Sequence, residues 1–535
     1  MGKTADPVAH VRRFVERHLS TIQAPGVAIG LTSRDGSLGV VTVGHANLPA
    51  RQLVRPEHRF QIGSISKSFT AIAILQEHEA GRLDLHAPVI EYLPWFDVPS
   101  PSAPVTLHHL LTHTAGLPTG RDFTGEGVHE LWALRGSELG FAPGTRFHYS
   151  NAGYKALGLV LGAVTGQPWW ELVRTRILEP LHMGSTDPIT TPEGKGTSAT
   201  GHVPPFDDRP RHPSHGLVPA PWIESATADG TICSTAEDMC AYMRMLLWGG
   251  DPLLSGPSFA RLIQPTAEDP EAPGEVYGYG MKTTTVDGRT SIGHTGSTVG
   301  FSAWMEVDPD EGVGVIILAN ADANRGPAAR FALRTLSAWS RDEPLPDIRD
   351  PMPLDRVERA EDYAGTYRSE YGELTLIADD GRLLLANHGE PAALVRQKGD
   401  TFVVAHPGFE RFPLSFERDV TYVTHVTHGD RWWGNDRYAG PATFERPTGW
   451  EVVAGHWRSH NPWYSNFRIL PRRGSLRFLW GWGDEDWELV PLPDGRFRVG
   501  TEEWSTRRIR FDTVIDGMAT RAVLDGASYY RTFTP

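Results

Sequence analysis

The C-terminal third of the chain contains an internal repeat, which strongly limits how that third can fold. AGTYRS at 364–369 is matched 90 residues later by AGHWRS at 454–459, and Phe416 and Phe511 lie 95 residues apart. Runs such as GELTLIADDGRLLLA between these positions are typical of strand–turn–strand units. Two copies are too few for a solenoid, and closure removes the exposed edges of a small sheet. We therefore predict two antiparallel, lipocalin-like β-barrels, at 358–447 and 448–535.

A proline-rich, charged stretch without apolar periodicity precedes the repeat and predicts a linker at 342–357. Residues 1–341 then form a separate domain. Two strand patterns near its start are joined through Asp35-Gly36, a hairpin signal, and FSAWMEVDPDEGVGVIILAN at 301–320 predicts a second hairpin. Helical patterns lie between them. We expect an α/β (α+β) domain, with an antiparallel sheet flanked by helices.

The segment FQIGSISKSFTA carries the first chemical signal of this domain. It puts Ser64 and Lys67 three residues apart on one face of a helix predicted over 64–79. A serine hydroxyl becomes nucleophilic when a base takes its proton, and a lysine with a lowered pKa can be that base. The helix N-terminus also directs N–H groups toward an oxyanion. Alone the motif is weak, because an exposed helix start with a solvated lysine gives the same pattern.

Two further motifs follow in a fixed order. Tyr149-Ser150-Asn151 lies in PGTRFHYSNAGYKALG, and His294-Thr295-Gly296 lies in SIGHTGSTVGF. The order resembles the penicillin-recognising serine hydrolases, which include class C β-lactamases, DD-peptidases and related esterases. The resemblance covers roughly residues 8–341. Followed by two barrels, the arrangement resembles bacterial D-aminopeptidase.

This resemblance implies roles for the catalytic candidates. Ser64 is the nucleophile, and its backbone N–H forms half of an oxyanion hole. Lys67 and Tyr149 are catalytic, and either could be the general base. Asn151 should bind a substrate amide carbonyl and hold Lys67, or it could cap the helix that begins at NAGYKALG.

The resemblance also implies a substrate-binding strand of four residues: His294, Thr295, Gly296 and Ser297. The Ser297 N–H is the candidate second oxyanion donor, and Gly296 should let a substrate backbone approach closely. Many relatives of this kind carry lysine where this chain has His294. Histidine is mostly neutral at pH 7, so the site offers less fixed positive charge to a substrate carboxylate. This favours esterase or D-aminopeptidase chemistry over β-lactamase activity.

Composition excludes several other classes. The net charge is −14 and no basic run occurs, so nucleic acid is not an expected partner. No apolar run approaches 18 residues and the N-terminus has no export pattern, so we expect a cytoplasmic protein without a membrane partner. The two cysteines, Cys233 and Cys240, are expected to be buried thiols. We expect no metal and no cofactor, a small-molecule or short-peptide substrate, and a homo-oligomer as one option.

Three functions remain open. The first is a serine hydrolase that forms an acyl-Ser64 intermediate from an amide or ester, best described as an aminopeptidase or amidase favouring D-configured residues. The second is a transacylase, peptide cyclase or esterase of natural-product metabolism that uses the same acyl-enzyme. The third is a non-catalytic binding module. Asp484, Glu485 and Asp486 in the Gly481–Trp487 hairpin could bind a substrate amino group, or form a solvated turn.

Overall fold

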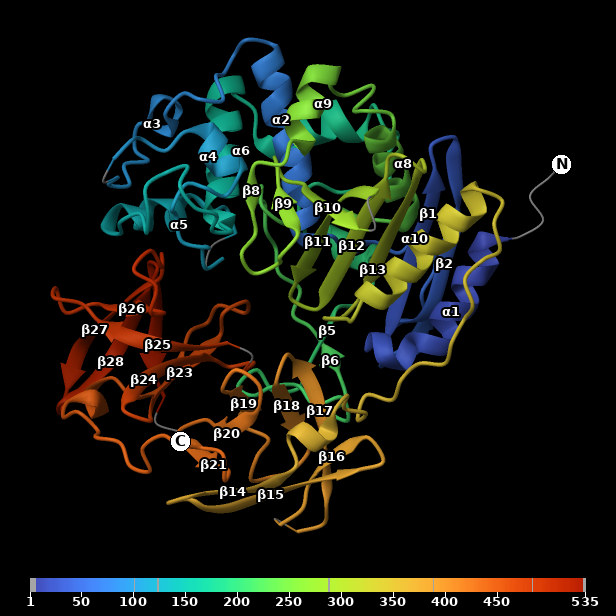
Figure 1. Ribbon diagram of the computed structural model, residues 1–535. Helices are drawn as coiled ribbons and strands as arrows, with labels where there is room; N and C mark the ends of the chain where they lie inside the picture. The colour runs from blue at the N-terminus through green and yellow to red at the C-terminus, as the bar shows by residue number, and fades with distance from the viewer. Residues whose placement is uncertain are drawn as a thin grey trace. The chain divides into compact units, whose positions relative to one another are not determined.

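A nine-stranded antiparallel sheet organises the first part of the chain (Figure 1), in the order β3-β2-β1-β13-β12-β11-β10-β9-β8 among the described residues. The computed structural model describes residues 6–100, 102–122, 125–286, 289–387, 389–483 and 485–532. The strands are β1 (Gly26–Ser33), β2 (Gly36–Asn47), β3 (Gln52–Leu53), β8 (Ala267–Glu268), β9 (Glu275–Tyr277), β10 (Lys282–Val286), β11 (Arg289–Thr298), β12 (Phe301–Asp308) and β13 (Val313–Ala319).

Both hairpins predicted from turn signals are present. β1 and β2 turn with Ser33 opposite Gly36, and β12 and β13 turn with Asp308 opposite Val313. β13 is buried along its whole length, as is nearly all of β1. These strands read as continuous apolar runs because both faces of the sheet are covered.

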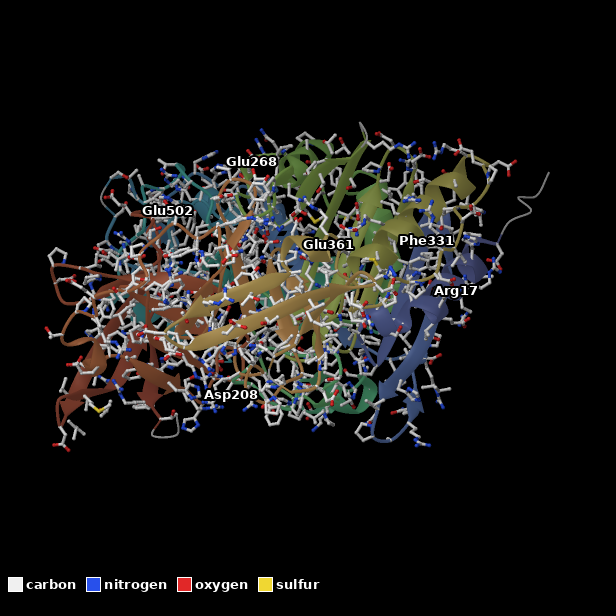
Figure 2. The ribbon with its side chains drawn as sticks, turned by 60° about the horizontal axis from the view of Figure 1, so that its bottom comes forward. Arg17, Asp208, Glu268, Phe331, Glu361 and Glu502 are labelled. Carbon is white, nitrogen blue, oxygen red and sulfur yellow. The ribbon has the colours of Figure 1, made fainter. Side chains whose placement is uncertain are left out.

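One sheet face is covered by the terminal helices of this part, α1 (Pro7–Ile22) and α10 (Gly326–Ser340). Phe14 of α1 stacks on Phe331 of α10 with ring centroids 4.0 Å apart. Figure 2 labels Phe331 and, on α1, Arg17. On the other face lies α8 (Ala236–Leu247), so close that a β-carbon on Gly30 would lie 2.5 Å from the carbonyl oxygen of Ala236.

The remaining helices include α2 (Ser66–Glu79), which is buried on all sides except in its last turn. A short 3₁₀ turn, η1 (Gly63–Ile65), leads into it, so Ser64 precedes the α-helix itself. A helix without a polar face belongs to a core, and this one lies at the centre of the helical layer. The others are α3 (Val89–Tyr92), α4 (Leu107–Leu111), α5 (Val128–Ala133), α6 (Asn151–Thr165), α7 (Trp169–Val173) and α9 (Gly256–Ile263).

Two closed eight-stranded antiparallel barrels follow, as predicted from the repeat. The first comprises β14 (Gly365–Ser369), β15 (Gly372–Asp379), β16 (Arg382–Leu385), β17 (Ala392–Lys398), β18 (Thr401–Val404), β19 (Leu414–Arg418), β20 (Val423–His428) and β21 (Arg431–Gly434). The second comprises β22 (Gly455–Arg458), β23 (Asn466–Arg472), β24 (Ser475–Trp480), β25 (Asp486–Pro491), β26 (Phe497–Val499), β27 (Arg508–Ile515), β28 (Met518–Leu524) and β29 (Ala527–Arg531).

The division of the chain differs from a simple succession of domains. One unit comprises the chain up to Val203 together with Pro219–Pro351, and the other comprises Pro204–Val218 together with the chain from Met352. The excursion Pro204–Val218 interrupts the predicted 1–341 domain between two short paired strands, β5 (His202–Val203) and β6 (Val218–Pro219). Within the second unit, Arg458 pairs with Asp207, Arg468 Nη1 donates to the Asp208 carbonyl at 2.7 Å, and Arg209 pairs with Glu410.

The predicted linker at 342–357 is anchored to the first unit over part of its length. Its proline-rich start lies along α1, where His10 Nε2 is 2.8 Å from the Pro346 carbonyl and Arg17 contacts Ile348 and Asp350. Both cysteines are free and buried, and burial raises the pKa of each thiol to about 12. They are therefore unreactive core residues.

Candidate active site

Ser64 and Lys67 meet at the start of α2. Lys67 Nζ donates to Ser64 Oγ at 3.0 Å and to the Asp229 backbone carbonyl at 2.8 Å. The Lys67 side chain is completely buried, whereas Ser64 is partly exposed. A substrate can therefore reach the hydroxyl while the amine stays out of water.

The environment of Lys67 makes its amine easier to deprotonate than an ordinary lysine. Burial lowers its pKa to about 8, and the opposing effect of the Asp229 carboxylate is smaller. Because a base acts best when its pKa is near the working pH, this amine is suited to take the Ser64 proton.

Tyr149 lies beside this pair, with Lys67 Nζ 4.9 Å from the centre of its ring. The hydroxyl is buried and has no hydrogen-bond partner among the described residues. Burial raises the pKa of Tyr149, an effect that the nearby Ser64 hydroxyl only partly offsets. Tyr149 is therefore a neutral phenol at neutral pH, with a proton to donate.

Asn151 is the first residue of α6, but the helix cap is its neighbour. Ser150 Oγ accepts from the Gly153 N–H at 3.1 Å, so the alternative role of Asn151 as the cap is wrong. Asn151 Oδ1 is buried and, among the described residues, accepts no hydrogen bond. It makes no direct bond to Lys67 in this structure.

His294 lies on β11 and is almost fully buried. Its Nε2 is 3.0 Å from the Tyr277 hydroxyl, and its Nδ1 bonds the Thr295 carbonyl. Burial, aided by the positive charge of Lys67, lowers the pKa of His294 to about 3. The imidazole is therefore neutral, in keeping with the small fixed positive charge expected at this position.

The segment from Thr295 to Thr298 faces the nucleophile turn. Pairing of β10 with β11 ends at Lys282–Gly293, so this half of β11 has a local edge although the strand is internal to the sheet. The turn η1 contacts this edge. A β-carbon on Gly63 would lie 2.6 Å from the Ser297 nitrogen, which shows how closely the two backbones approach. Ser64 and Ser297, the two predicted oxyanion donors, thus lie on touching segments.

The structure requires a glycine at position 296 for a reason that we did not expect. A β-carbon there would lie 1.8 Å from the Ile62 carbonyl oxygen and 3.2 Å from the Ser64 nitrogen. The glycine is needed for the protein's own nucleophile turn to pack, whereas we expected it to admit a substrate backbone.

Three site residues were not singled out as functional from the sequence. His113 accepts from the Ser150 N–H at 3.0 Å and lies against the Tyr149 ring. Tyr277 holds His294, and Asp229 holds Lys67 through its carbonyl. No motif marks them, because each comes from a segment remote in sequence from its partner.

The acidic hairpin of the second barrel is only partly described. Asp484 lies outside the described residues, and Asp486 pairs with Arg472 and, at 2.8 Å, with Arg477 Nε. Asp486 therefore has a role within its own barrel. The described residues contain no group of three or more His, Cys, Asp or Glu side chains that could hold a metal ion. In the same part of the chain, every helix is too short or too polar to cross a membrane.

Comparison with known proteins identifies the family. Residues 11–338 match the family model described as Beta-lactamase, so the chain belongs to the beta-lactamase family. Penicillin-binding protein 4 of Amycolatopsis lactamdurans is 28% identical over 372 residues, which cover 65% of this chain and 94% of that protein. Protein flp of Staphylococcus aureus (strain N315) is 25% identical over 61% of this chain, which spans 65% of that relative's length.

Solved structures agree with this assignment. A D-stereospecific amidohydrolase from Streptomyces sp. has a TM-score of 0.52 and 25% identity, and the match covers 61% of this chain and 98% of that one. An octameric penicillin-binding protein homologue from Pyrococcus abyssi has a TM-score of 0.58 and 24% identity, covering 78% of this chain and 97% of that one. The second likeness concerns the fold alone. The resemblance predicted from the ordered motifs is thus confirmed at the level of the family.

Proposed function

We propose that this chain is an acyl-serine hydrolase that cleaves an amide or ester through Ser64, and that it is an aminopeptidase or amidase favouring D-configured residues. One observation carries the proposal: the buried amine of Lys67, with its pKa lowered to about 8, donates to the Ser64 hydroxyl at 3.0 Å. A serine whose hydroxyl is partnered by such a base is an activated nucleophile.

The reaction follows from this geometry. The lone pair of Lys67 Nζ takes the Ser64 proton as Oγ bonds to the substrate carbonyl carbon. The carbonyl π pair moves onto oxygen, where the N–H groups of Ser64 and Ser297 stabilise it. Collapse of this intermediate breaks the bond to the amine or alcohol, which takes the proton from Lys67 through the neutral Tyr149 phenol. Water then attacks the ester by the same route and frees the acid.

The substrate preference has two supports. The neutral, hydrogen-bonded His294 offers no cation to a terminal carboxylate, which argues against substrates of the β-lactam and DD-peptide kind. The Streptomyces sp. neighbour is a D-stereospecific amidohydrolase, which supports an amide of D-configuration for this chain. Homo-oligomerisation is also proposed, because the P. abyssi homologue is octameric, and light scattering on the purified protein tests it. A cytoplasmic location remains a prediction.

The test of the activity is covalent labelling. A fluorophosphonate probe should label the wild type on the peptide containing Ser64, and D-alanine p-nitroanilide should leave an acyl group on the same peptide. Ser64→Ala should lose both adducts. Ser185→Ala removes an exposed hydroxyl from the same unit and serves as the matched control. Labelling at another serine, or turnover by Ser64→Ala, would contradict the proposal.

A further inference from the structure

The carboxylate of Asp229 acts through its charge on Lys67 and Lys155, but neither lysine hydrogen-bonds it. The residue is only 5% exposed, and its Oδ1 is buried without a hydrogen-bond partner among the described residues. Its backbone carbonyl accepts from Lys67 Nζ at 2.8 Å. The Cβ atom of Asp229 is two bonds from the carbon of this carbonyl group, so the side chain begins next to the Ser64–Lys67 pair. Its carboxylate raises the pKa of Lys67 and so acts at this position.

The two lysines near this carboxylate are already engaged by other groups. Lys67 Nζ donates to Ser64 Oγ and to the Asp229 backbone. Lys155 Nζ is held between the carboxylates of Asp122 and Glu130. Neither ammonium donates to the Asp229 side chain.

Burying a carboxylate without a hydrogen bond is costly, because water is lost and nothing replaces it. Such groups are rare in folded proteins and each needs an explanation. Three of the candidate-site residues have a buried oxygen without a hydrogen-bond partner among the described residues: Asp229 at Oδ1, Asn151 at Oδ1 and Tyr149 at its hydroxyl. The hydroxyl is assigned above to proton transfer. Two acceptors remain, one of them charged, and a cation with several N–H donors would satisfy both.

We propose that Asp229 binds the free ammonium group of the substrate residue that acylates Ser64, with Asn151 as a second acceptor. The inference rests on the proposed function. The α-amino nitrogen of such a residue is two bonds from the carbonyl carbon that Ser64 attacks, so it must lie close to the nucleophile. Lys67 Nζ bonds both the Asp229 backbone carbonyl, at 2.8 Å, and Ser64 Oγ, at 3.0 Å, so the side chain of Asp229 begins in the same neighbourhood as the nucleophile. The site therefore takes unblocked aminoacyl amides and esters, and disfavours N-acylated ones.

The kinetic test compares a charged donor with its uncharged isostere. Asp229→Asn keeps the shape and removes the charge. It should lower kcat/KM for D-alanine p-nitroanilide by about 10- to 100-fold, the effect of losing one charge-assisted hydrogen bond. Hydrolysis of the propionyl p-nitroanilide, which lacks only the amino group, reports any effect that acts through Lys67, and the loss on D-alanine p-nitroanilide should exceed the loss on this substrate by that factor. Asp35→Asn removes the same charge from an exposed turn that asparagine suits equally, and should change neither rate.

An equal loss on both substrates, with a shifted pH profile, would overturn the inference and make Asp229 a residue that acts through Lys67. Asp229→Asn should also keep the wild-type melting temperature, because the amide has the shape of the carboxylate and Oδ1 has no hydrogen bond to lose. Asp229→Ser provides a second uncharged variant should the first fold poorly.

A binding measurement separates this inference from the proposed function. In Ser64→Ala, ligand-observed NMR should show D-alaninamide binding at least about tenfold more tightly than propionamide, and the preference should vanish in Ser64→Ala/Asp229→Asn. No preference in Ser64→Ala would overturn the ammonium site whatever the activity. If instead the preference is present but wild-type Ser64 is never acylated, the proposed function fails and the ammonium site stands.

Discussion

Gly63 and Ser297 lie in such close backbone contact that a β-carbon on Gly63 would be 2.6 Å from the Ser297 nitrogen and 2.8 Å from its carbonyl oxygen. Gly63 also has a φ of +54°, a conformation that glycine adopts without cost. The contact brings together the two N–H groups that we propose as oxyanion donors.

Gly63→Ala should therefore separate these segments and lower kcat by about 10²–10³-fold, the usual effect of losing one oxyanion donor. Gly81→Ala is the matched control, since Gly81 has a φ of +68° but open space around its missing β-carbon. It reports backbone strain without the steric clash. Equal losses of activity in the two variants would show that strain, and not the position of Ser297, decides the rate.

Ser64 and Lys67 should behave as one catalytic unit. Ser64→Ala is expected to abolish turnover, and Lys67→Ala nearly so, because the hydroxyl loses its base. The double variant should be no slower than Ser64→Ala, since members of one unit fail together. Steady-state rates on one chromogenic ester measure this. Losses that multiply in the double variant would mean that Lys67 acts on a step that does not involve Ser64.

Activity should depend on pH through Lys67, whose pKa burial lowers to about 8. The base works only when it is neutral. Below about pH 8 the amine is increasingly protonated, so kcat/KM should rise with pH and level off above that value. The pH profile of kcat/KM reports this group in the free enzyme. A rising limb centred near the ordinary lysine pKa would show that Lys67 is not the base.

The fold was predictable from sequence where a pattern was local or repeated. The barrels follow from strand–turn–strand alternation and from AGTYRS at 364–369 recurring as AGHWRS at 454–459. The excursion Pro204–Val218 was not predictable, because it is held by pairs such as Asp207–Arg458 between residues far apart in the chain. Nothing in the segment itself indicates which unit it joins.

The residues of the candidate site also divide into those that a local sequence pattern predicts and those that only long-range contacts bring together. Ser64 and Lys67 share one helical turn and could be found from spacing alone. The cap of α6 could not be assigned, since Ser150 and Asn151 are adjacent and both favour that position. Tyr277 and Asp229 join the site only through tertiary contacts, so no spacing in the chain relates them to Lys67.

Tyr149→Phe should reduce acylation by about 10²–10⁴-fold, the usual contribution of general acid–base catalysis. Its hydroxyl is buried without a partner among the described residues, so removing it should leave the free energy of unfolding unchanged or slightly higher. Pre-steady-state acylation and thermal unfolding measure the two effects. Tyr277→Phe is the comparison, because that hydroxyl bonds His294 and its loss should destabilise the fold. If Tyr149→Phe changed KM alone, Tyr149 would line the substrate-binding site without taking part in proton transfer.

Removal of the barrels should depend on how the excursion Pro204–Val218 is treated. Truncation after Pro351 deletes Arg458, Arg468 and Glu410, the partners of Asp207, Asp208 and Arg209. The excursion would then keep its charges and the exposed Phe206 with nothing to fold against. This truncated variant should aggregate or melt at a lower temperature.

A second variant, which also replaces 204–218 by a short turn between β5 and β6, should be monodisperse and should still react with a fluorophosphonate at Ser64. Size-exclusion chromatography with light scattering, thermal unfolding and labelling compare the two. If both variants are equally stable and equally labelled, the excursion does not depend on the barrels for its structure. If only the second is stable, the first unit can be studied alone, and its preference for free-amine over N-blocked substrates shows whether the barrels contribute to specificity.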